Sequence, residues 1–268
     1  MNDASSSDIL SYDQYAEIEK AGLTSPHIVE IARGGQSLLF YGSEHVNDPE
    51  HPQFQDIEDR WKTFINNAAR PIALVEGRFD EVSEDDTSDK IQAITDGGEA
   101  QFVVYLARKY DIEVASPEPD RLWEANQLAE EFGRDKVVFY YFMRQIAWWS
   151  GLTEKPDMKT EATKMLELME RSYDWEDVDF SIERMLDIHQ ELFAKPLDWD
   201  DSQWTYDLTT PTPLDYVTNE LARRSGELRD DYIFHQIADY WKAGRSPFVV
   251  FGSSHVIRLE PALRKLLA

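Results

Sequence analysis

The sequence predicts an α/β protein with a largely parallel, mixed sheet flanked by helices and a helical insertion or cap in the middle of the chain. In the first and last parts, apolar runs of strand length alternate with segments of helical spacing, the pattern of parallel strands joined by crossover helices. In the middle, helical patterns follow one another without a convincing strand. We therefore expect a first α/β half over residues 1–120, a helical insertion or cap over 121–225, and a second α/β part over 226–268.

Short apolar runs mark the expected strands. They are residues 27–31, 37–41, 71–75, 112–115 and 247–251. Gly34-Gly35 separates the first two runs, which is a hairpin signature. The third run is almost entirely apolar, as expected of a strand that is buried on both faces of a sheet.

Helical spacing of apolar residues marks the expected helices. They are residues 53–68, 99–110, 122–132, 136–149, 160–171, 181–193, 214–224 and 229–241, and a terminal helix from residue 260. Residues 1–10 are expected to form a frayed tail, and the acidic stretch 81–89 a surface loop.

The chain is strongly acidic, with 52 acidic and 27 basic residues and a formal net charge of −25. A field of that sign repels nucleic acid and anionic membrane surfaces, so neither is expected as a partner. The same field attracts cations, including divalent metals, although solubility alone also explains a high charge.

The 268 residues include no cysteine, which excludes disulfides, thiolate zinc ligands and cysteine nucleophiles. Met1–Ser7 has neither the basic nor the apolar region of a secretory signal. No apolar run approaches the ~20 residues of a membrane-spanning helix. We therefore expect a soluble, cytoplasmic protein, and the sequence predicts no particular oligomeric state.

An aromatic-Gly-Ser-x-His-Val segment occurs twice, at Tyr41–Val46 and Phe251–Val256. Each copy is the first polar break after a predicted buried strand. Ligand sites of open parallel sheets lie beyond the carboxyl ends of the strands, so His45 and His255 converge if their strands are neighbours. Imidazole is the commonest side-chain metal ligand, and its pKa near ~6.5 also suits a general base. One histidine at a strand end is usually structural, but the repetition favours a site.

Three glutamates are candidates for the same site as the two histidines. Glu76 closes the third strand and is a candidate metal ligand, or a partner that orients an imidazole. Glu99 follows a pair of glycines at a predicted helix start, where ordinary capping also explains a carboxylate. Glu118 follows the fourth strand in a loop that prolines make rigid. It is preferred to Asp120, which is suited to cap the next helix.

Arg229 is predicted to open the helix before the last strand, where its charge opposes the helix dipole. An arginine in that place is suited to clamp a substrate carboxylate or to stabilise an oxyanion. Ser43 and Ser253 do not lie in Gly-x-Ser-x-Gly, so no nucleophile elbow is predicted. The helical metalloprotease motif His-Glu-x-x-His is also absent from the sequence.

The order and spacing of Gly42-x-x-His45, Glu76, Arg229-Asp230 and Gly252-x-x-His255 resemble those of one superfamily. It joins the TraB/PrgY/GumN proteins, the Tiki proteases, the erythromycin esterases and the ChaN-type haem-binding proteins. The resemblance implies a sheet with helices on both faces, a His/Glu/His site between the halves, and a hydrolytic activity that is often metal-dependent. The chain has Arg-Asp where many relatives have Arg-Asn, and the resemblance does not extend to its middle half.

These observations predict a hydrolase that cleaves an ester or peptide bond in a small-molecule or peptide substrate. The expected ligands of a divalent metal ion (Mn, Co or Zn) are His45, Glu76, His255 and Glu99; alternatively, the histidines act directly as the base that activates water. Arg229 would neutralise charge on the substrate, and Glu118 would tune the site. A non-catalytic haem- or metal-binding protein of the ChaN type is the first alternative. A scaffold whose helical middle binds a partner is the second.

Overall fold

The computed structural model describes residues 6–23, 25–77, 89–150 and 157–267. All but Asp89 of the predicted acidic loop 81–89 lies outside the described residues. The chain divides into two compact units. We call Met1–Glu118 with Arg229–Ala268 the sheet unit, and Pro119–Leu228 the helical unit.

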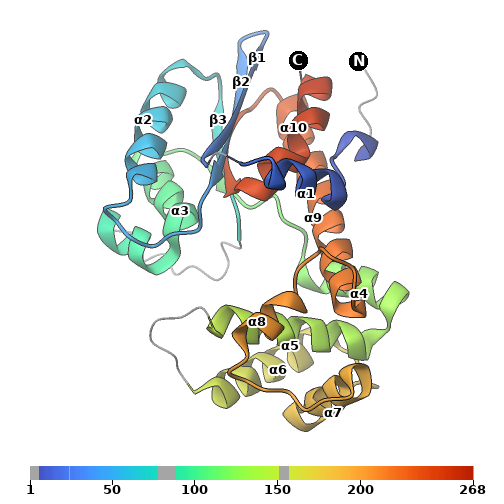
Figure 1. The fold of residues 1–268 in the computed structure, drawn as a ribbon. Helices are drawn as coiled ribbons and strands as arrows, with labels where there is room; N and C mark the ends of the chain where they lie inside the picture. Colours follow the sequence, from blue (N-terminus) through green and yellow to red (C-terminus); the bar gives the residue numbers. More distant parts are fainter. Residues whose placement is uncertain (1–5, 24, 78–88, 151–156, 268) are drawn as a thin grey trace. The chain divides into compact units, whose positions relative to one another are not determined.

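The described residues of the sheet unit form a five-stranded sheet with the order β1-β2-β5-β3-β4. Three of these strands, β1, β2 and β3, are labelled in Figure 1. The strands are β1 (His27–Arg33), β2 (Gln36–Ser43), β3 (Pro71–Val75), β4 (Val114–Ala115) and β5 (Ser246–Gly252). β1 pairs with β2 in the antiparallel direction, as the hairpin signature predicts, and the other neighbours are parallel. β5 is buried along its whole length because it has a strand on either side and helices on both faces. The predicted fold class is confirmed.

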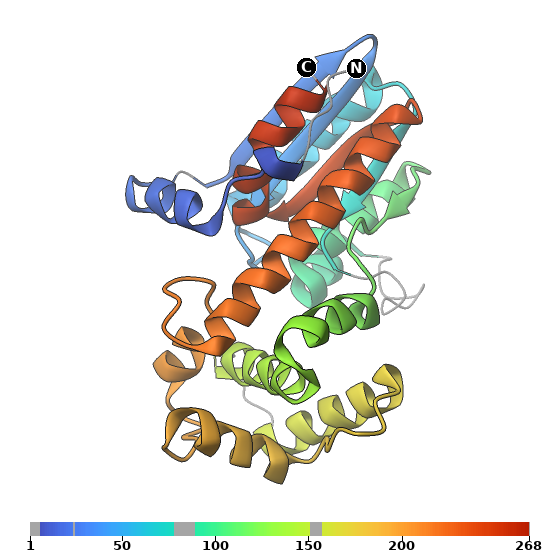
Figure 2. The ribbon, with the colours of Figure 1, turned by 90° about the vertical axis from the view of Figure 1, so that its right-hand side faces the viewer.

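Helices cover both faces of this sheet. They are α2 (Pro52–Asn67) and α3 (Lys90–Lys109) on one face, and α10 (Ser253–Leu267) and the part of α9 (Val217–Lys242) from Arg229 onward on the other. Figure 2 shows this part of α9, in orange, beside α10, in red. Successive side chains of β2 point to opposite faces, so Leu38 and Phe40 pack with α9 and α10, whereas Leu39 and Tyr41 pack with α2 and α3.

The helical unit has its own apolar core. Its helices are α4 (Arg121–Phe132), α5 (Arg134–Ser150), α6 (Met158–Tyr173), α7 (Ile182–Phe193), α8 (Ser202–Asp207) and the first part of α9. His189 is fully buried in this core, where Nδ1 pairs with the Lys195 carbonyl and Nε2 accepts a hydrogen bond from the Trp204 indole. It is therefore a structural histidine. None of the helices in the described part of the chain is long and apolar enough to cross a membrane.

One predicted break in a helix is wrong. Segments 214–224 and 229–241 were expected as two helices, but α9 runs without interruption from Val217 to Lys242. Ser225 and Gly226 are weak helix formers, which explains the predicted break. Tertiary contacts override that preference: Ser225 is buried, and its hydroxyl donates a hydrogen bond to Glu124 at 2.6 Å. Arg229 consequently lies inside a helix and does not open one.

The described residues near each terminus form more helical structure than the sequence predicts. α10 begins at Ser253, well before residue 260, because Val256, Leu259 and Leu263 form a buried stripe against the sheet that outweighs the interior Pro261. The tail is not frayed where it is described: η1 (Ser6–Asp8) is a 3₁₀ turn, and α1 (Tyr12–Lys20) follows it. A capping box formed by Ser11 and Gln14 starts α1. Helix α8 was not predicted from the sequence, because it is too short to show a periodicity.

Replacing Gly42 by Ala is expected to lower the free energy of unfolding by about 1–3 kcal/mol, the usual cost of overpacking a core. A Cβ atom at position 42 would lie 2.8 Å from the His27 carbonyl oxygen and 3.0 Å from the Ser253 Cα, and neither backbone atom can move freely. Urea unfolding monitored by circular dichroism measures the loss. The control is Gly252→Ala, whose new Cβ would meet side-chain atoms of His45 and Glu76 and no backbone atom among its nearest neighbours, so it should cost less. A wild-type midpoint for Gly42→Ala contradicts the prediction.

Candidate functional site

The two Gly-Ser-x-His segments lie side by side at the carboxyl edge of the sheet. β2 and β5 are parallel neighbours with Ser43 opposite Gly252, so the two copies are displaced by one residue along the strands. After Ser43 the chain enters a loop, whereas after Gly252 it turns at once into α10. The side chain of His45 is 65% exposed on that loop, and that of His255 is 11% exposed in the first turn of α10. The repeat therefore places two histidines at one edge in different surroundings.

Glu99 holds the ring of His45. It follows a pair of glycines with non-helical backbone that interrupts α3, and it is buried. Its Oε1 lies 2.5 Å from His45 Nδ1 and accepts a hydrogen bond from the Ser43 hydroxyl at 3.0 Å. The hydrogen bond to Glu99 outweighs desolvation and, with the negative charges of Glu76 and Glu99, raises the pKa of His45 to about 9. His45 therefore carries a proton at neutral pH.

Asp230 holds the ring of His255 in the same way. This aspartate lies on α9 and is fully buried, and its Oδ1 is 2.5 Å from His255 Nδ1. Its other oxygen, Oδ2, lies 2.5 Å from a guanidinium nitrogen of Arg258. In both pairs the carboxylate engages Nδ1, which leaves Nε2 as the nitrogen directed toward the rest of the site.

Glu76 faces the Nε2 atoms of both imidazoles. Its Oε2 is 3.9 Å from His45 Nε2, and its Oε1 is 3.8 Å from His255 Nε2. The Gly252 backbone N–H donates to Oε2 at 2.9 Å, and Arg229 lies 3.3 Å from Oε1. Burial by itself would raise the pKa of Glu76. The positive charges of His255, Arg229 and His45, with the backbone hydrogen bond, outweigh burial and lower this pKa to about 2.

Gly252 leaves space for the close approach of these groups. A Cβ atom at position 252 would lie 2.7 Å from His45 Nε2 and 3.6 Å from Glu76 Oε2. Because glycine has no side chain, the ring of His45 can take this position next to the backbone, and a Cβ atom would displace the ring. The glycine in the second copy of the motif therefore belongs to the site.

Arg229 joins Glu76 to Glu118. One nitrogen of its guanidinium pairs with both carboxylates, and all three side chains are mostly buried. The positive charge of Arg229 is thus balanced by the negative charges of Glu76 and Glu118. The expected opposition to a helix dipole does not arise, because Arg229 lies inside α9.

All the predicted site residues lie in the sheet unit, and the structure brings them together. We call the following residues the His–carboxylate cluster: His45, Glu76, Glu99, Glu118, Arg229, Asp230 and His255. Glu99 was grouped with Glu76 as a candidate metal ligand, but it lies at Nδ1 of His45, on the other side of the ring from Glu76. Its place is that of a residue that orients the imidazole.

Asp230 was absent from the predicted site, although the sequence contains a signal for it. Ile233, Phe234 and Ile237 lie three, four and seven residues further along α9 and are buried, so Asp230 lies on the same apolar face. A carboxylate on such a face needs a buried partner. Ser43 was considered only as a nucleophile and rejected, whereas its hydroxyl supports Glu99.

The cluster contains the types of donor atom that a metal ion needs, but these atoms are not arranged as they are in a metal site. Two Nε2 atoms and a carboxylate are donors that Zn²⁺ and similar ions take, and Glu99 and Asp230 match the outer carboxylates of such sites. Among the described residues, however, no group of three His, Cys, Asp or Glu side chains has the spacing of a metal site. A cation bound to Glu76 would also face the guanidinium of Arg229, 3.3 Å from the same carboxylate.

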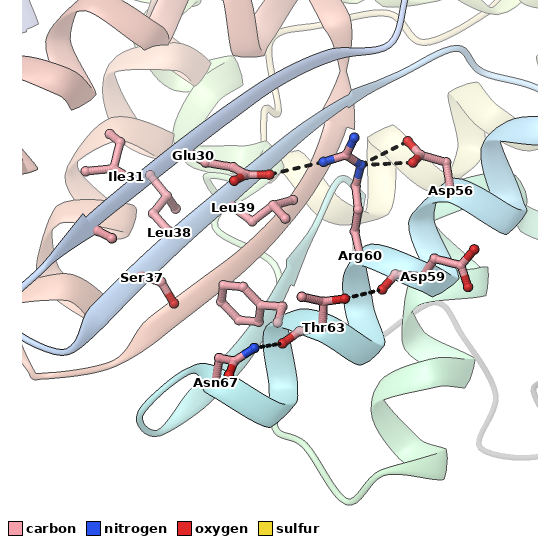
Figure 3. A pocket seen from close by; sticks show the side chains of 12 residues that line it. Glu30, Ile31, Ser37, Leu38, Leu39, Asp56, Asp59, Arg60, Thr63 and Asn67 are labelled. Carbon is pink, nitrogen blue, oxygen red and sulfur yellow. Dashed lines mark hydrogen bonds and ion pairs between the residues drawn. The ribbon is translucent and has the colours of Figure 1, made fainter.

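A hollow of about 690 Å³ lies between the β1–β2 hairpin and α2, apart from the residues of the cluster (Figure 3). Arg60 crosses it and pairs with Asp56 at 3.0 Å and Glu30 at 3.1 Å. Its lining contains no residue of the His–carboxylate cluster and no histidine. The hollow therefore lacks the histidine pair that distinguishes the cluster.

Replacing Glu99 by Gln is expected to lower the pKa of His45 from about 9 toward the ordinary ~6.5, because the variant removes the charged hydrogen-bond acceptor without changing its shape. A ¹H–¹⁵N NMR titration of the histidine rings measures this pKa. Glu44→Gln is the matched control, since it removes a charge next to His45 in sequence but from an exposed side chain. An unchanged pKa of His45 in Glu99→Gln contradicts the geometry described above.

Comparison of the chain with protein-family models, with curated proteins and with solved structures finds no match.

Proposed function

We propose that the protein is a hydrolase that cleaves an ester or peptide bond in a small-molecule or peptide substrate at the His–carboxylate cluster. One observation carries the proposal: buried carboxylates engage Nδ1 of both imidazoles, and both Nε2 atoms face Glu76. A carboxylate at Nδ1 fixes the tautomer and orientation of the ring and leaves Nε2 for proton transfer. Two imidazoles prepared in this way suit a reaction that needs both a base and an acid.

The two histidines take different roles in the proposed reaction. His45 already carries a proton, because Glu99 raises its pKa to about 9, so it is suited to donate. His255 Nε2 accepts a proton from water as the water oxygen attacks the carbonyl carbon. His45 Nε2 then gives its proton to the leaving oxygen or nitrogen, and the bond to the leaving group breaks. Proton return from His255 to His45 through solvent restores the starting state.

Glu76 and Arg229 supply fixed charges in this scheme. Glu76 remains ionised, because its pKa is lowered to about 2, and it orients the attacking water and the Nε2–H group of His45. Arg229 stabilises negative charge that develops on the carbonyl oxygen, and Glu118 holds the guanidinium in place. Hydrolysis in this form needs no group other than those of the chain and water.

A metal-dependent form of the reaction has partial support. A divalent ion held by the two Nε2 atoms and Glu76 would lower the pKa of bound water toward neutrality. The charge balance between Glu76 and Arg229 favours direct acid–base catalysis instead. The surroundings of the imidazoles also favour hydrolysis over haem binding, since both Nε2 atoms face an anionic carboxylate.

Replacing His255 by Ala is expected to lower kcat/KM by about 100- to 10 000-fold, the range for loss of a general acid or base. Turnover is measured on a panel of p-nitrophenyl esters and fluorogenic peptides, with His45→Ala as a second variant. His235→Ala is the matched control, because His235 is exposed on α9 and pairs only weakly, at 3.7 Å, with Asp231. Wild-type turnover in His255→Ala, or an inert wild-type protein with and without Mn²⁺, Co²⁺ or Zn²⁺, contradicts the proposal.

Dialysis against EDTA is expected to leave the hydrolytic rate unchanged, since the proposed acid and base are side chains of the cluster. The rate before and after dialysis and the metal content by mass spectrometry are measured together. Loss of activity with EDTA and its recovery with Mn²⁺, Co²⁺ or Zn²⁺ would instead make the Nε2 atoms metal ligands.

A further inference from the structure

Arg258 is a buried charge next to the proposed active site that the reaction scheme does not use. It is 2% exposed and lies on α10, three residues after His255. Residues with that spacing share one face of a helix. Both side chains therefore reach the same carboxylate, that of Asp230 on α9.

Asp230 lies between the histidine and the arginine and contacts each with a different oxygen. Oδ1 is 2.5 Å from His255 Nδ1, and Oδ2 is 2.5 Å from Arg258 Nη1. A fully buried carboxylate that lost the arginine would keep an uncompensated charge and could rotate or draw in water. The orientation of the Asp230 carboxylate, and with it the ring of His255, therefore depends on Arg258.

The N-terminal segment encloses the other side of Arg258. The guanidinium Nε donates to the Leu10 carbonyl oxygen at 2.9 Å, and the Leu10 N–H donates to the Arg258 carbonyl at 3.0 Å. The Tyr12 ring lies over the guanidinium, with its centroid 3.6 Å away, which is a close cation–π contact. An ion pair between Lys265 and Asp8, at 2.6 Å, ties the same segment to α10.

We propose that Arg258 is a positioning residue that fixes Asp230 and, through it, the ring of His255, and that Leu10 and Tyr12 complete this support. The N-terminal segment is then a part of the active site, although none of its residues touches the proposed reacting atoms. The kinetic consequence rests on the proposed hydrolase function, whereas the structural consequence for the ring of His255 does not.

His45 provides an internal comparison. Its partner Glu99 accepts a hydrogen bond from the hydroxyl of Ser43, which lies on β2. None of the described contacts joins Ser43 to Arg258. A change at Arg258 should therefore alter the ring of His255 and leave that of His45 as it is.

The test replaces Arg258 by Met, which keeps an unbranched apolar side chain and removes the guanidinium and its charge. ¹H–¹⁵N NMR spectra of the histidine rings, recorded at fixed pH without substrate, should show shifted His255 signals in this variant. The His45 and His189 signals should be unchanged, the latter reporting an intact helical unit. Arg258→Lys should restore the His255 signals in part. Hydrolysis should fall about 10- to 100-fold in Arg258→Met, the usual cost of losing a group that orients a functional histidine.

Two further variants serve as a control and as a second test of the proposal. Arg264→Met removes an exposed charge from the same helix, where it pairs with Glu260, and should shift no histidine signal other than that of His27, which also contacts Glu260. Tyr12→Leu removes the aromatic face and keeps the ion pair with Asp230; if Arg258→Met does not fold, this variant must still shift the His255 signals. Unshifted His255 signals in a folded Arg258→Met or in Tyr12→Leu overturn the proposal. Shifted signals without any turnover would support the positioning role and contradict the hydrolase.

Discussion

The parallel pairing of β2 with β5 is the constraint on which the rest of the site depends. The two motif copies end at the same edge of the sheet. Because Ser43 lies opposite Gly252, their register differs by one residue. One copy continues into a loop and the other into α10, so one imidazole is exposed and the other nearly buried. The pairing of β5 with β3, its neighbour on the other side, brings the Gly252 N–H within 2.9 Å of Glu76, the residue that follows β3.

Charge compensation inside the cluster explains how a protein with a net charge of −25 buries carboxylates at one place. Asp230 contacts an imidazole and a guanidinium, Glu76 is flanked by two imidazoles and Arg229, and Glu118 shares that arginine. Buried ion pairs of this kind contribute little net stability, because desolvation offsets their attraction. These ion pairs fix the orientation of the side chains, because a buried charge has few positions in which it contacts a partner of opposite charge.

Local patterns were sufficient for much of the fold and for six residues of the cluster. Apolar runs located the strands, because a strand buried on both faces must be apolar throughout. The repeated Gly-Ser-x-His marked two strand ends, and the rule that ligands lie beyond parallel strands brought Glu76 and Glu118 into the prediction. Helix boundaries were less accurate: α9 continues through Ser225, and α10 begins at Ser253, because burial of side chains outweighs local helix preference.

The sequence by itself determined the sheet, the helical middle and the pair of histidines, since these follow from periodicity and from the placement of polar residues after apolar strands. Only the tertiary structure decided which carboxylate engages which nitrogen. Glu99 and Asp230 are distant in sequence from the histidines they hold, and Arg258 acts through contacts with both α9 and the N-terminal segment. Whether a hydrogen bond forms depends on differences of a few tenths of an ångström in the distance between donor and acceptor. Packing fixes this distance, and sequence spacing does not.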